Sequence, residues 1–405
     1  MSEMNVAPVF SLSVGMFLQP DGPLMFFWLA CVVCLAHVLI EPVSPRPLGW
    51  WAAAGAMLGL ALLSKYSSLL LVAGAGLYVL TRREQRRWLA HPGPYVALAI
   101  ALLAFSPVLV WNARHHWISF VWQSTRGLDE LQGVRLDWML RNIAGQSLEL
   151  LPWLWFALVV ELVRSFRRDA GAPRRLIAWL AIVPIALFTG VAAYALTGQR
   201  HFHWGMPGYL LLLLPLGDTL HRWLAAGSVL ARRALAGTIA VSLLGMTVLV
   251  SHIATGWLKD LPGLSTALAG DNDPTLECID FTPLSRAFRE RGLLDDRRIF
   301  VFSDWWFRAG KVDYALGGRL PVLALSPTDP RSFAFFDRSE RWLGQDGILV
   351  TTKTTVEEVQ GHYAPYFSRI TALGEVPAGR HGRREITLYL YRCEGLRRPY
   401  PLPYG

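Results

Sequence analysis

Charged residues are scarce in this sequence of 405 residues. Asp, Glu, Lys and Arg together make up 17% of it, whereas hydrophobic residues make up 53%. A soluble globular chain is about a quarter charged, so the composition argues against an ordinary soluble protein. Tryptophan, with 17 copies, is abundant, and aromatic belts at lipid–water interfaces are typical of membrane helices. We therefore expect a membrane protein.

The motifs of enzymes that use soluble nucleotides are also missing. The sequence has no Gly-rich phosphate loop of the Walker or dinucleotide kind and no nucleophile elbow, so nothing indicates a site for ATP, NAD or a soluble nucleotide sugar. A basic region and a cleavage site are absent near Met1, so we expect no cleavable signal peptide. If the protein transfers a group at the outer face of a membrane, the donor of that group should therefore be linked to a lipid.

Cysteine occurs four times. Cys31 and Cys34 lie one helical turn apart in an apolar segment, where they act as small apolar residues, and a metal site would need more ligands. Cys278 and Cys393 both lie in the C-terminal part of the chain. They could form a disulfide if that part lies outside the cytoplasm, but their spacing fixes no geometry, so both states stay open.

Long apolar segments fill the sequence up to Thr255 and stop after it. About 20 apolar residues are needed to cross a bilayer as a helix. The two segments that flank Ser64-Lys65-Tyr66 are each too short, so we expect them to form a broken or re-entrant pair. The predicted segments are Val6–Leu18, Pro23–Ile40, Trp50–Leu63, Ser67–Leu80, Pro94–Trp111, Trp138–Val163, Leu176–Leu196, Gly205–Leu220 and Ala234–Ile253.

Arginine clusters between these segments predict the orientation. Up to Thr255 there are 19 Lys and Arg against 11 Asp and Glu, and beyond it 20 against 19. The basic surplus therefore lies among the apolar segments, as the positive-inside rule predicts, and does not indicate nucleic-acid binding. We place the Arg-rich loops 82–87, 164–175 and 222–233 in the cytoplasm. Alternation then puts 19–21, 64–66, 112–137, 198–204 and everything after Thr255 on the outer face.

The C-terminal region 256–405 has the pattern of a soluble α/β domain, which follows a multi-span region 1–255. Runs rich in Val, Ile, Leu and Tyr predict strands, and helical periodicity predicts three helices between them. The fold class is therefore a polytopic α-helical membrane protein with a C-terminal soluble α/β domain. The predicted strands are Arg298–Ser303, Leu320–Leu325, Gly347–Thr352 and Glu385–Cys393, and the predicted helices are Pro283–Arg291, Trp305–Leu316 and Thr354–His362.

Asp21 stands in the run QPDGP at 19–23, at the expected outer mouth of an apolar segment. Because proline cannot continue a helix and restricts the residue before it, a helix boundary should lie here. The motif alone favours a helix cap, in which the carboxylate accepts from free backbone amides. The alternative is a functional carboxylate held at the membrane interface, and the two roles are compatible.

Lys65 is the only lysine before Thr255 and lies between two apolar segments. An ionisable residue at such depth is a functional candidate, because burying its charge is costly. A break in a helix beside a lysine suits a phosphate, since free amides and a point charge both attract the anion. The alternative is that Lys65 snorkels to the interface. The neighbouring Tyr66 is a further candidate for substrate binding.

The two remaining outer loops supply the other candidates. In the loop after Trp111, Gln123 and Arg126 are three residues apart and share a helical face, and arginine can grip a phosphate with two hydrogen bonds. In the second loop His201, His203 and Trp204 suit hydrogen bonding to a sugar or headgroup, with plain loop residues as the alternative. Two histidines without a carboxylate partner make a weak metal site.

On these residues the chain resembles the bacterial branch of the dolichyl-phosphate-mannose–protein mannosyltransferase superfamily, the ArnT-like GT-C glycosyltransferases, which include aminoarabinose transferases that modify lipid A. The resemblance covers nearly the whole chain, and the order of its motifs makes it specific. The matching stretches are 19–28 (QPDGPLMFFW), 59–66 (GLALLSKY), 106–112 (SPVLVWN), 117–126, His203-Trp204 before Pro207, and 309–319 (AGKVDYALGGR).

The resemblance implies a GT-C fold with its active site on the outer face and a polyprenyl-phosphate sugar as donor. The acceptor would be a lipid, a glycan or a protein. Asp21 matches an acidic position that would deprotonate or orient the acceptor, and Lys65 and Arg126 match cations that would stabilise the departing phosphate. No cofactor is required. Gln123 and Trp204 stand where some relatives have metal ligands, so a divalent metal is not supported.

Members of this family begin with further spans and a long outer loop that carries an aspartate, the principal base. This sequence starts almost on the motif of Asp21, and Glu3 is the only acid before it. We therefore expect either a misassigned start or a truncated member of the family. The first hypothesis is a glycosyltransferase of the bacterial inner membrane with an extracytoplasmic C-terminal domain. The second is a non-catalytic protein that binds or transports polyprenyl-phosphate lipids.

Overall fold

The computed structural model describes residues 20–40, 45–128, 133–194, 201–401 and 403, without the side chains of residues 125–128 and 271. The chain separates into two compact units, Met1–Met246 and Thr247–Gly405, which we call the helical unit and the sheet unit. The boundary lies inside a long helix, α11, so this helix belongs to both units. The predicted segment Val6–Leu18 lies outside the described residues.

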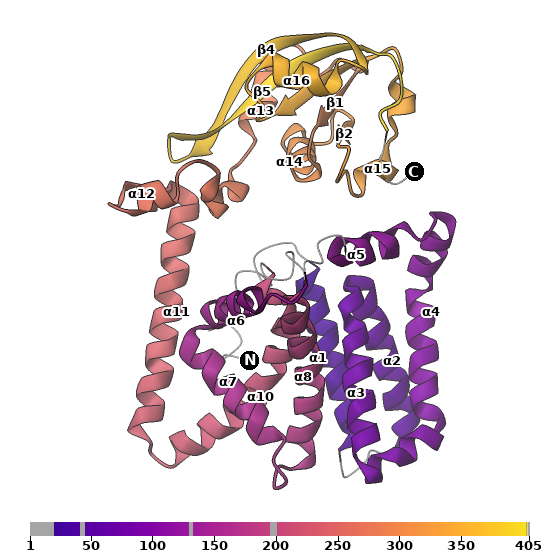
Figure 1. The fold of residues 1–405 in the computed structure, drawn as a ribbon, viewed down its shortest axis with the longest axis vertical. Helices are drawn as coiled ribbons and strands as arrows, with labels where there is room; N and C mark the ends of the chain where they lie inside the picture. Colours follow the sequence, from indigo (N-terminus) through magenta and orange to yellow (C-terminus); the bar gives the residue numbers. More distant parts are fainter. Residues whose placement is uncertain (1–19, 41–44, 129–132, 195–200, 402, 404–405) are drawn as a thin grey trace. The chain divides into compact units, whose positions relative to one another are not determined.

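Helices make up the described part of the helical unit (Figure 1). Five of the described helices are long and apolar enough to cross a membrane, namely α1, α2, α4, α8 and α11, and the bent pair α6 and α7 would make a sixth. The helices are α1 (Asp21–Leu39), α2 (Pro47–Ser64), α3 (Leu69–Thr81), α4 (Pro92–Arg114), α5 (Ile118–Leu128), α6 (Leu136–Leu150), α7 (Pro152–Ser165), α8 (Ala172–Val191), α10 (Met206–Ala225) and α11 (Val229–Thr255).

Two of the predicted spans differ from the structure. The break at Lys65 is present, but α2 has 18 residues and is long enough to cross alone, so the expectation that both flanking segments are too short was wrong for α2. The predicted single span Trp138–Val163 is instead two helices that meet at 107°. Pro152 starts α7, where proline suits the first helical position, and Leu151 before it is non-helical, with φ 70° and ψ 127°.

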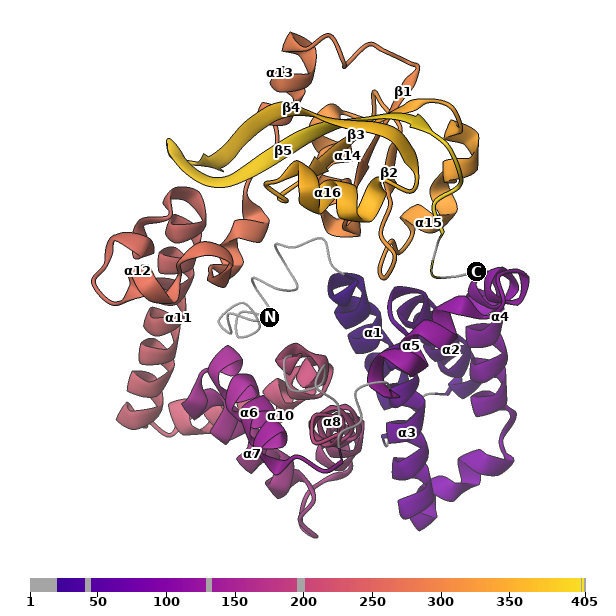
Figure 2. The same ribbon diagram turned by 45° about the horizontal axis from the view of Figure 1, so that its top comes forward.

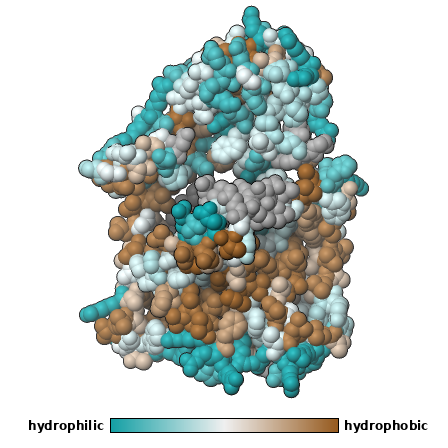
Figure 3. All heavy atoms as spheres, in the orientation of Figure 1, coloured by the Kyte–Doolittle hydropathy of each residue, from teal (hydrophilic) through white to brown (hydrophobic). Residues whose placement is uncertain are grey.

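Small residues allow the helices to approach one another closely. A Cβ atom at Gly55 of α2 would lie 2.3 Å from the carbonyl oxygen of Ala97 in α4. A Cβ atom at Gly208 of α10 would lie 2.4 Å from the carbonyl oxygen of Ala181 in α8. Small residues at helix crossings are typical of membrane bundles, because close packing there replaces the hydrophobic effect. Figure 3 shows brown, hydrophobic side chains over much of the visible side of the helical unit.

The Arg-rich loops gather at one end of the helical unit. Glu161 in α7 is buried and accepts hydrogen bonds from Arg164 at 3.1 Å and from Arg174 of α8 at 2.7 Å. Arg174 also bonds Asp218 of α10 at 2.7 Å. Ion pairs thus tie α7, α8 and α10 together where the Arg-rich loops 164–175 and 222–233 begin or end.

The sheet unit contains a five-stranded sheet with strand order β2-β1-β3-β5-β4 (Figure 2). β1 is parallel to β2 and β3, and β5 is antiparallel to β3 and β4. The strands are β1 (Ile299–Ser303), β2 (Val322–Ala324), β3 (Asp346–Thr351), β4 (Phe367–Arg380) and β5 (Arg383–Leu396), and the main helices are α13 (Pro283–Glu290), α14 (Trp306–Leu316) and α16 (Val356–Tyr363). The expected α/β architecture is confirmed, but β4 was not predicted.

The two faces of the sheet bury separate cores. Val301 and Ile348 face α13 and α14, whereas Phe302 and Leu349 face α16, as the alternation of side chains along a strand requires. Cys393 lies buried in the core on the α16 side. Cys278 is exposed, and the two residues have free thiols, so the disulfide left open from the sequence is not formed in this structure.

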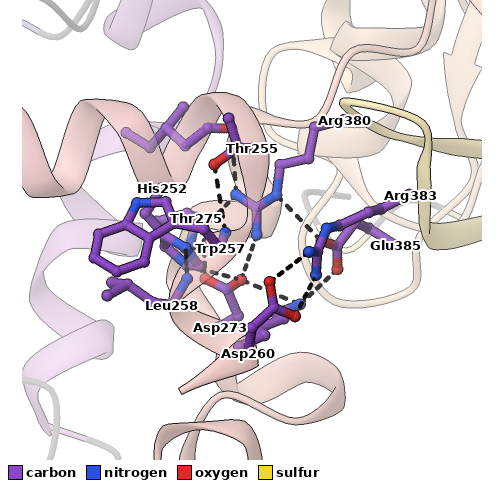
Figure 4. A network of polar contacts seen from close by, with 12 residues as sticks. His252, Thr255, Trp257, Leu258, Asp260, Asp273, Thr275, Arg380, Arg383 and Glu385 are labelled. Carbon is purple, nitrogen blue, oxygen red and sulfur yellow. Dashed lines mark hydrogen bonds and ion pairs between the residues drawn. The ribbon is translucent and has the colours of Figure 1, made fainter.

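A buried ion cluster joins the end of α11 to the β4–β5 hairpin (Figure 4). Arg380 donates to Asp273 at 2.6 Å and to Glu385 at 3.2 Å, and Lys259 contacts the same two carboxylates at 3.2 and 2.6 Å. His252 of α11 lies 3.4 Å from Asp273. The carboxylate of Asp273 is fully buried, so its charge is matched by protein cations rather than by water.

Candidate functional site

Asp21 and Lys65 form an ion pair at the end of the helical unit opposite the Arg-rich loops. The Lys65 Nζ atom lies 2.8 Å from Oδ1 of Asp21 and 3.1 Å from Oδ2. The Asp21 side chain is 9% exposed and that of Lys65 28% exposed. Two of the predicted outer loops therefore do meet at one end of the bundle.

The local sequence explains the position of the carboxylate. α1 begins at Asp21, Pro20 occupies the capping position, and no side chain caps the helix. The prediction of an Asp21 cap was therefore wrong, because the carboxylate turns to Lys65 and not to the backbone amides. Its place in the first helical turn still favours a negative charge.

Lys65 occupies the break between α2 and a short 3-10 turn, η2 (Tyr66–Ser68). Its backbone is extended, with φ −160° and ψ 132°. The Lys65 amide donates to the Ala61 carbonyl at 2.9 Å, and its own carbonyl accepts from the buried Ser68 hydroxyl at 2.8 Å. Both sides of the break are thus held by hydrogen bonds, which fixes the position from which the ammonium group reaches Asp21.

His203 belongs to the same polar end. It lies in a 3-10 turn, η4 (Phe202–Gly205), between α8 and α10. Burial, and then the Lys65 ammonium, lower the pKa of His203 to about 4, while the Asp21 carboxylate acts in the opposite direction. The imidazole is therefore neutral at neutral pH and can donate one hydrogen bond and accept another.

The other two candidates of this loop stack on each other. The rings of His201 and Trp204 have centroids 4.5 Å apart and an interplanar angle of 29°. Phe202 packs against α6, where a Cβ atom at Gly145 would lie 2.3 Å from its ring. In the part of the chain that the structure describes, no three His, Cys, Asp or Glu side chains gather as a metal site.

Tyr66 ties the α2–α3 turn to the first turn of α5. Its hydroxyl lies 3.1 Å from the Ser119 hydroxyl, and its ring stacks on Phe120 at 5.1 Å. The Asn112 side chain is fully buried and accepts from the Ser119 hydroxyl at 2.6 Å and from the Ser119 amide at 3.2 Å. These partners of Tyr66 were not predicted as functional residues, although Asn112 and Ser119 fall in the matching stretches.

The α5 candidates are not seen at the ion pair. Gln123 is exposed on α5, and it has no hydrogen-bond or ion-pair partner among the described residues. Arg126 lies in α5, but its side chain is outside the described part of the chain. The structure therefore brings together Asp21, Lys65 and His203, and leaves Gln123 apart.

A buried polar network in the same unit was missed by the sequence reasoning. Tyr209 of α10 donates to Gln146 of α6 at 2.7 Å and accepts from Trp155 of α7 at 2.9 Å. Gln146 also donates to Thr189 of α8 at 3.1 Å. These hydrogen bonds thus connect α6 and α7, the two helices of the bent pair, to α8 and α10. The signal in the sequence was the presence of polar residues, among them Asn142 and Gln146 four positions apart, inside the predicted span Trp138–Val163.

This arrangement can bind a phosphate and position a hydroxyl group. A partly exposed ammonium offers three donors, of which the carboxylate uses only some. The carboxylate keeps lone pairs that can accept from a hydroxyl group, and the neutral imidazole is a further hydrogen-bonding group. Such a set suits an anionic headgroup together with an alcohol at a membrane interface.

Parts of this sequence are similar to known proteins. The model of the family described as dolichyl-phosphate-mannose-protein mannosyltransferase matches residues 4–111. A curated relative, the lipid A galacturonosyltransferase RgtD of Rhizobium johnstonii, is 26% identical over 211 residues, which cover 52% of this chain and 41% of the relative. The match thus spans about two fifths of that relative.

Solved structures of ArnT from Cupriavidus metallidurans have a similar fold. The structure bound to undecaprenyl phosphate has a TM-score of 0.54 at 14% identity and covers 96% of this chain and 77% of ArnT. The apo structure has a TM-score of 0.54 at 16% identity and covers 95% and 76%. The expected fold class is therefore confirmed, and the chain has an ArnT-like fold and resembles the ArnT-like GT-C glycosyltransferases.

Proposed function

We propose that this protein is a membrane glycosyltransferase that takes its sugar from a polyprenyl-phosphate carrier. One observation carries the proposal: the ion pair of Lys65 and Asp21 at the polar end of an apolar helical bundle with an ArnT-like fold. One ArnT structure holds undecaprenyl phosphate, which supports a donor of this class. The name of the curated relative supports a lipid acceptor, and glycans and proteins are the other acceptor classes.

In this proposal Lys65 binds the phosphate of the donor. The oxygen of an acceptor hydroxyl group forms a bond to the anomeric carbon, and the bond from that carbon to the phosphate oxygen breaks. The leaving phosphate keeps the electron pair, and the nearby ammonium stabilises its charge. Asp21 orients the acceptor hydroxyl and takes its proton. Arg126, Tyr66, Gln123, His201, His203 and Trp204 remain candidate contacts to the donor or acceptor.

The protein would act in the bacterial inner membrane, with Asp21, Lys65 and the sheet unit on the extracytoplasmic side. The separation of Arg-rich loops from the Asp21 end supports this orientation, because positive loops stay in the cytoplasm. We propose no cofactor and no resident metal. Accessibility of a cysteine introduced at Ser119, in a variant that also carries Cys278→Ser to remove the exposed native thiol, to a membrane-impermeant thiol reagent tests the orientation in intact cells.

A second candidate function is a non-catalytic protein that binds or transports polyprenyl-phosphate lipids. One observation favours it, namely that both carboxylate oxygens of Asp21 are engaged by Lys65, so Asp21 can act simply as the partner that holds the cation. In that case phosphate binding persists without transfer.

The deciding experiment uses the full chain in proteoliposomes with two readouts. Undecaprenyl phosphate binding tests the Lys65 role, and transfer from a radiolabelled undecaprenyl-phosphate sugar to added lipid A tests catalysis. We expect Lys65→Ala to abolish binding, and Asp21→Asn to abolish transfer while binding and insertion remain. Unchanged binding by Lys65→Ala would remove the phosphate role. Binding without any transfer by the wild type would favour the second function.

A further inference from the structure

The sheet unit contains a pocket far along the sequence from the residues discussed above. Its volume is about 290 Å³. It is lined by aromatic, cationic and hydroxyl side chains, chiefly Phe281, Trp305, Phe307, Arg308, Lys311 and Thr352. Most of these residues come from α14 and from the segments that follow β1 and β3.

The topology places this pocket where open α/β sheets bind ligands. β1 and β3 are parallel neighbours. The chain leaves β1 through α14 to reach β2 on one side, and it leaves β3 through α16 to reach β4 at the far edge on the other side. Ligands bind outside the carboxyl ends of strands at such a reversal, because the diverging connections open a crevice there. Trp305 follows β1, and Thr352 follows β3 directly.

Lys311 is the cation of the pocket that has no carboxylate partner. Arg308 is neutralised by Asp304 and donates to the Thr352 hydroxyl at 3.0 Å. Lys311 instead donates to the backbone carbonyl of Glu277 at 3.1 Å, and among the described residues no carboxylate lies within ion-pair distance of it. Burial lowers the pKa of Lys311, and the Asp280 and Glu277 carboxylates oppose this only from beyond ion-pair distance.

Aromatic rings surround the same ammonium group. The Lys311 Nζ atom lies 4.1 Å from the centroid of the Phe281 ring and 5.8 Å from that of Phe307. Trp305 packs against Phe307 with centroids 5.2 Å apart, yet 39% of its surface is exposed at the pocket. An exposed indole beside a cation is a surface for the apolar face of a ring that also bears a negative charge.

The two acidic side chains that line the pocket, Asp273 and Glu277, form no ion pair with Lys311. The Asp273 carboxylate already pairs with the Arg380 guanidinium group at 2.6 Å and with the Lys259 ammonium group at 3.2 Å. Glu277 is exposed to solvent and meets Lys311 through its backbone carbonyl. The Thr352 hydroxyl accepts from Arg308, so its proton is free to donate to a ligand oxygen.

From these contacts we infer that the pocket binds an anionic saccharide unit, a sugar that carries a phosphate. The phosphate lies against Lys311, the sugar ring stacks on Trp305, and Thr352 donates to a hydroxyl or phosphate oxygen. The unit is either the headgroup of a phosphorylated glycolipid or a free sugar phosphate. This pocket lies in the sheet unit, shares no residue with the Asp21–Lys65 pair and does not depend on the proposed transfer reaction.

Calorimetric titration of the full chain in detergent micelles tests the inference. The probes are glucose 1-phosphate, glucose and inorganic phosphate. We expect glucose 1-phosphate to bind more tightly than either part alone. Lys311→Gln should weaken binding roughly tenfold, since a charge-assisted contact is lost. Trp305→Ala should weaken it about threefold to tenfold through lost stacking.

Matched controls lie on and after the same helix. Tyr314 is 83% exposed on α14 and Arg319 pairs with Asp295, both outside the pocket lining. Tyr314→Ala and Arg319→Gln should leave affinity unchanged. Thermal unfolding of each variant shows whether it is folded. A folded Lys311→Gln protein with unaltered affinity, or a wild type that does not bind glucose 1-phosphate, overturns the inference.

The source of the sugar phosphate is decided by a second titration with nanodiscs that carry lipid A. Tighter binding to these nanodiscs than to glucose 1-phosphate, lost in Lys311→Gln, supports a glycolipid headgroup. Equal binding of the free sugar phosphate, with the same dependence on Lys311, supports a soluble ligand. Binding of inorganic phosphate as tight as that of glucose 1-phosphate contradicts the saccharide.

Discussion

The Lys65 ammonium group contacts both carboxylate oxygens of Asp21, at 2.8 and 3.1 Å, across 44 residues of sequence. The contact joins the start of α1 to the break after α2. It also places the Asp21 carboxylate and the Lys65 ammonium group together at one end of an apolar helical bundle. Removing one partner leaves the other poorly solvated, whereas removing both leaves no unpaired charge.

We therefore expect Lys65→Gln to destabilise the protein by about 2 kcal/mol, less than for a fully buried pair, because Lys65 is partly exposed. The double variant Asp21→Asn with Lys65→Gln should recover most of that loss. The measurement is thermal unfolding in detergent micelles for the four proteins of the cycle. Arg168→Gln, at an exposed position of an Arg-rich loop, is the control. Additive losses in the double variant would mean that the two charges do not interact.

The position of Lys65 could be read from the sequence, but that of its neighbours could not. A single lysine between two apolar segments is a local pattern, and the break it predicted is present. Its distance to His203 depends on how η4 folds back between α8 and α10, which no local pattern encodes. The cap predicted for Asp21 failed for the same reason, because a partner 44 residues away outweighed the nearby amides.

Two features of the fold were not predicted, strand β4 and the bend between α6 and α7, and each has a physical explanation. Strand β4 contains Gly374 and Pro377, which weaken any prediction of a strand, yet both are tolerated because β4 lies at the edge of the sheet and has register shifts beside Gly374 and Gly379. The angle between α6 and α7 arises at one residue, Leu151, within a continuous apolar run. Hydropathy predicts that such a run is buried in lipid, but not that it bends.

His203 should stay neutral over the physiological pH range. Its pKa of about 4 lies below the ordinary value of 6.5, so the unfolded chain binds a proton between these values that the folded chain does not. Stability contributed by the neutral imidazole is thus present above pH 6.5 and is lost as the pH falls towards 4. Titration of ¹³C-labelled histidine by NMR, assigned with His203→Gln, measures this directly.

The variant Lys65→Gln supplies the control for this titration. Because the ammonium group contributes to the low pKa of His203, Lys65→Gln should move the His203 midpoint upwards, although burial keeps it below 6.5. A His203 resonance that titrates near pH 6.5 in the wild type would show that the imidazole is solvated and lies apart from the ion pair.

Asn112 should control the arrangement of the turn that contacts Tyr66. Its buried side chain accepts from both the amide and the hydroxyl of Ser119, so Asn112→Ala leaves the amide without this acceptor and the hydroxyl with only its contact to Tyr66. We expect a loss of stability of about 1–3 kcal/mol. Hydrogen exchange of the Ser119 amide, followed by mass spectrometry, should become faster in this variant.

Ser124 provides a comparison on the same helix. It is exposed and bonds only the Val121 carbonyl one turn earlier, so Ser124→Ala should leave both stability and exchange unchanged. Equal exchange of the Ser119 amide in the wild type and in Asn112→Ala would indicate that the turn is held by the contacts of Tyr66 instead.

The cluster around Asp273 should determine the acid stability of the sheet unit. Burial alone would raise the pKa of Asp273, but hydrogen bonds from Thr275, Lys259 and Arg380 outweigh it and hold the pKa well below its ordinary value. The folded state therefore binds fewer protons than the unfolded state below about pH 4. Stability from this carboxylate is present at neutral pH and is lost as the pH falls through the folded pKa.

Arg380→Met tests this cluster, because it leaves the fully buried Asp273 carboxylate with less of its matching charge. We expect a loss of about 3–5 kcal/mol, and partial recovery in the double variant with Asp273→Asn. The measurement is limited proteolysis of the full chain between pH 4 and 8, with cleavage after Thr255 as the readout. Arg383→Met is the matched control on the same hairpin, since its partner Asp260 is exposed and solvent screens that ion pair, so its loss should have little effect. If both variants are cleaved at equal rates, the buried cluster contributes no more than a surface ion pair does.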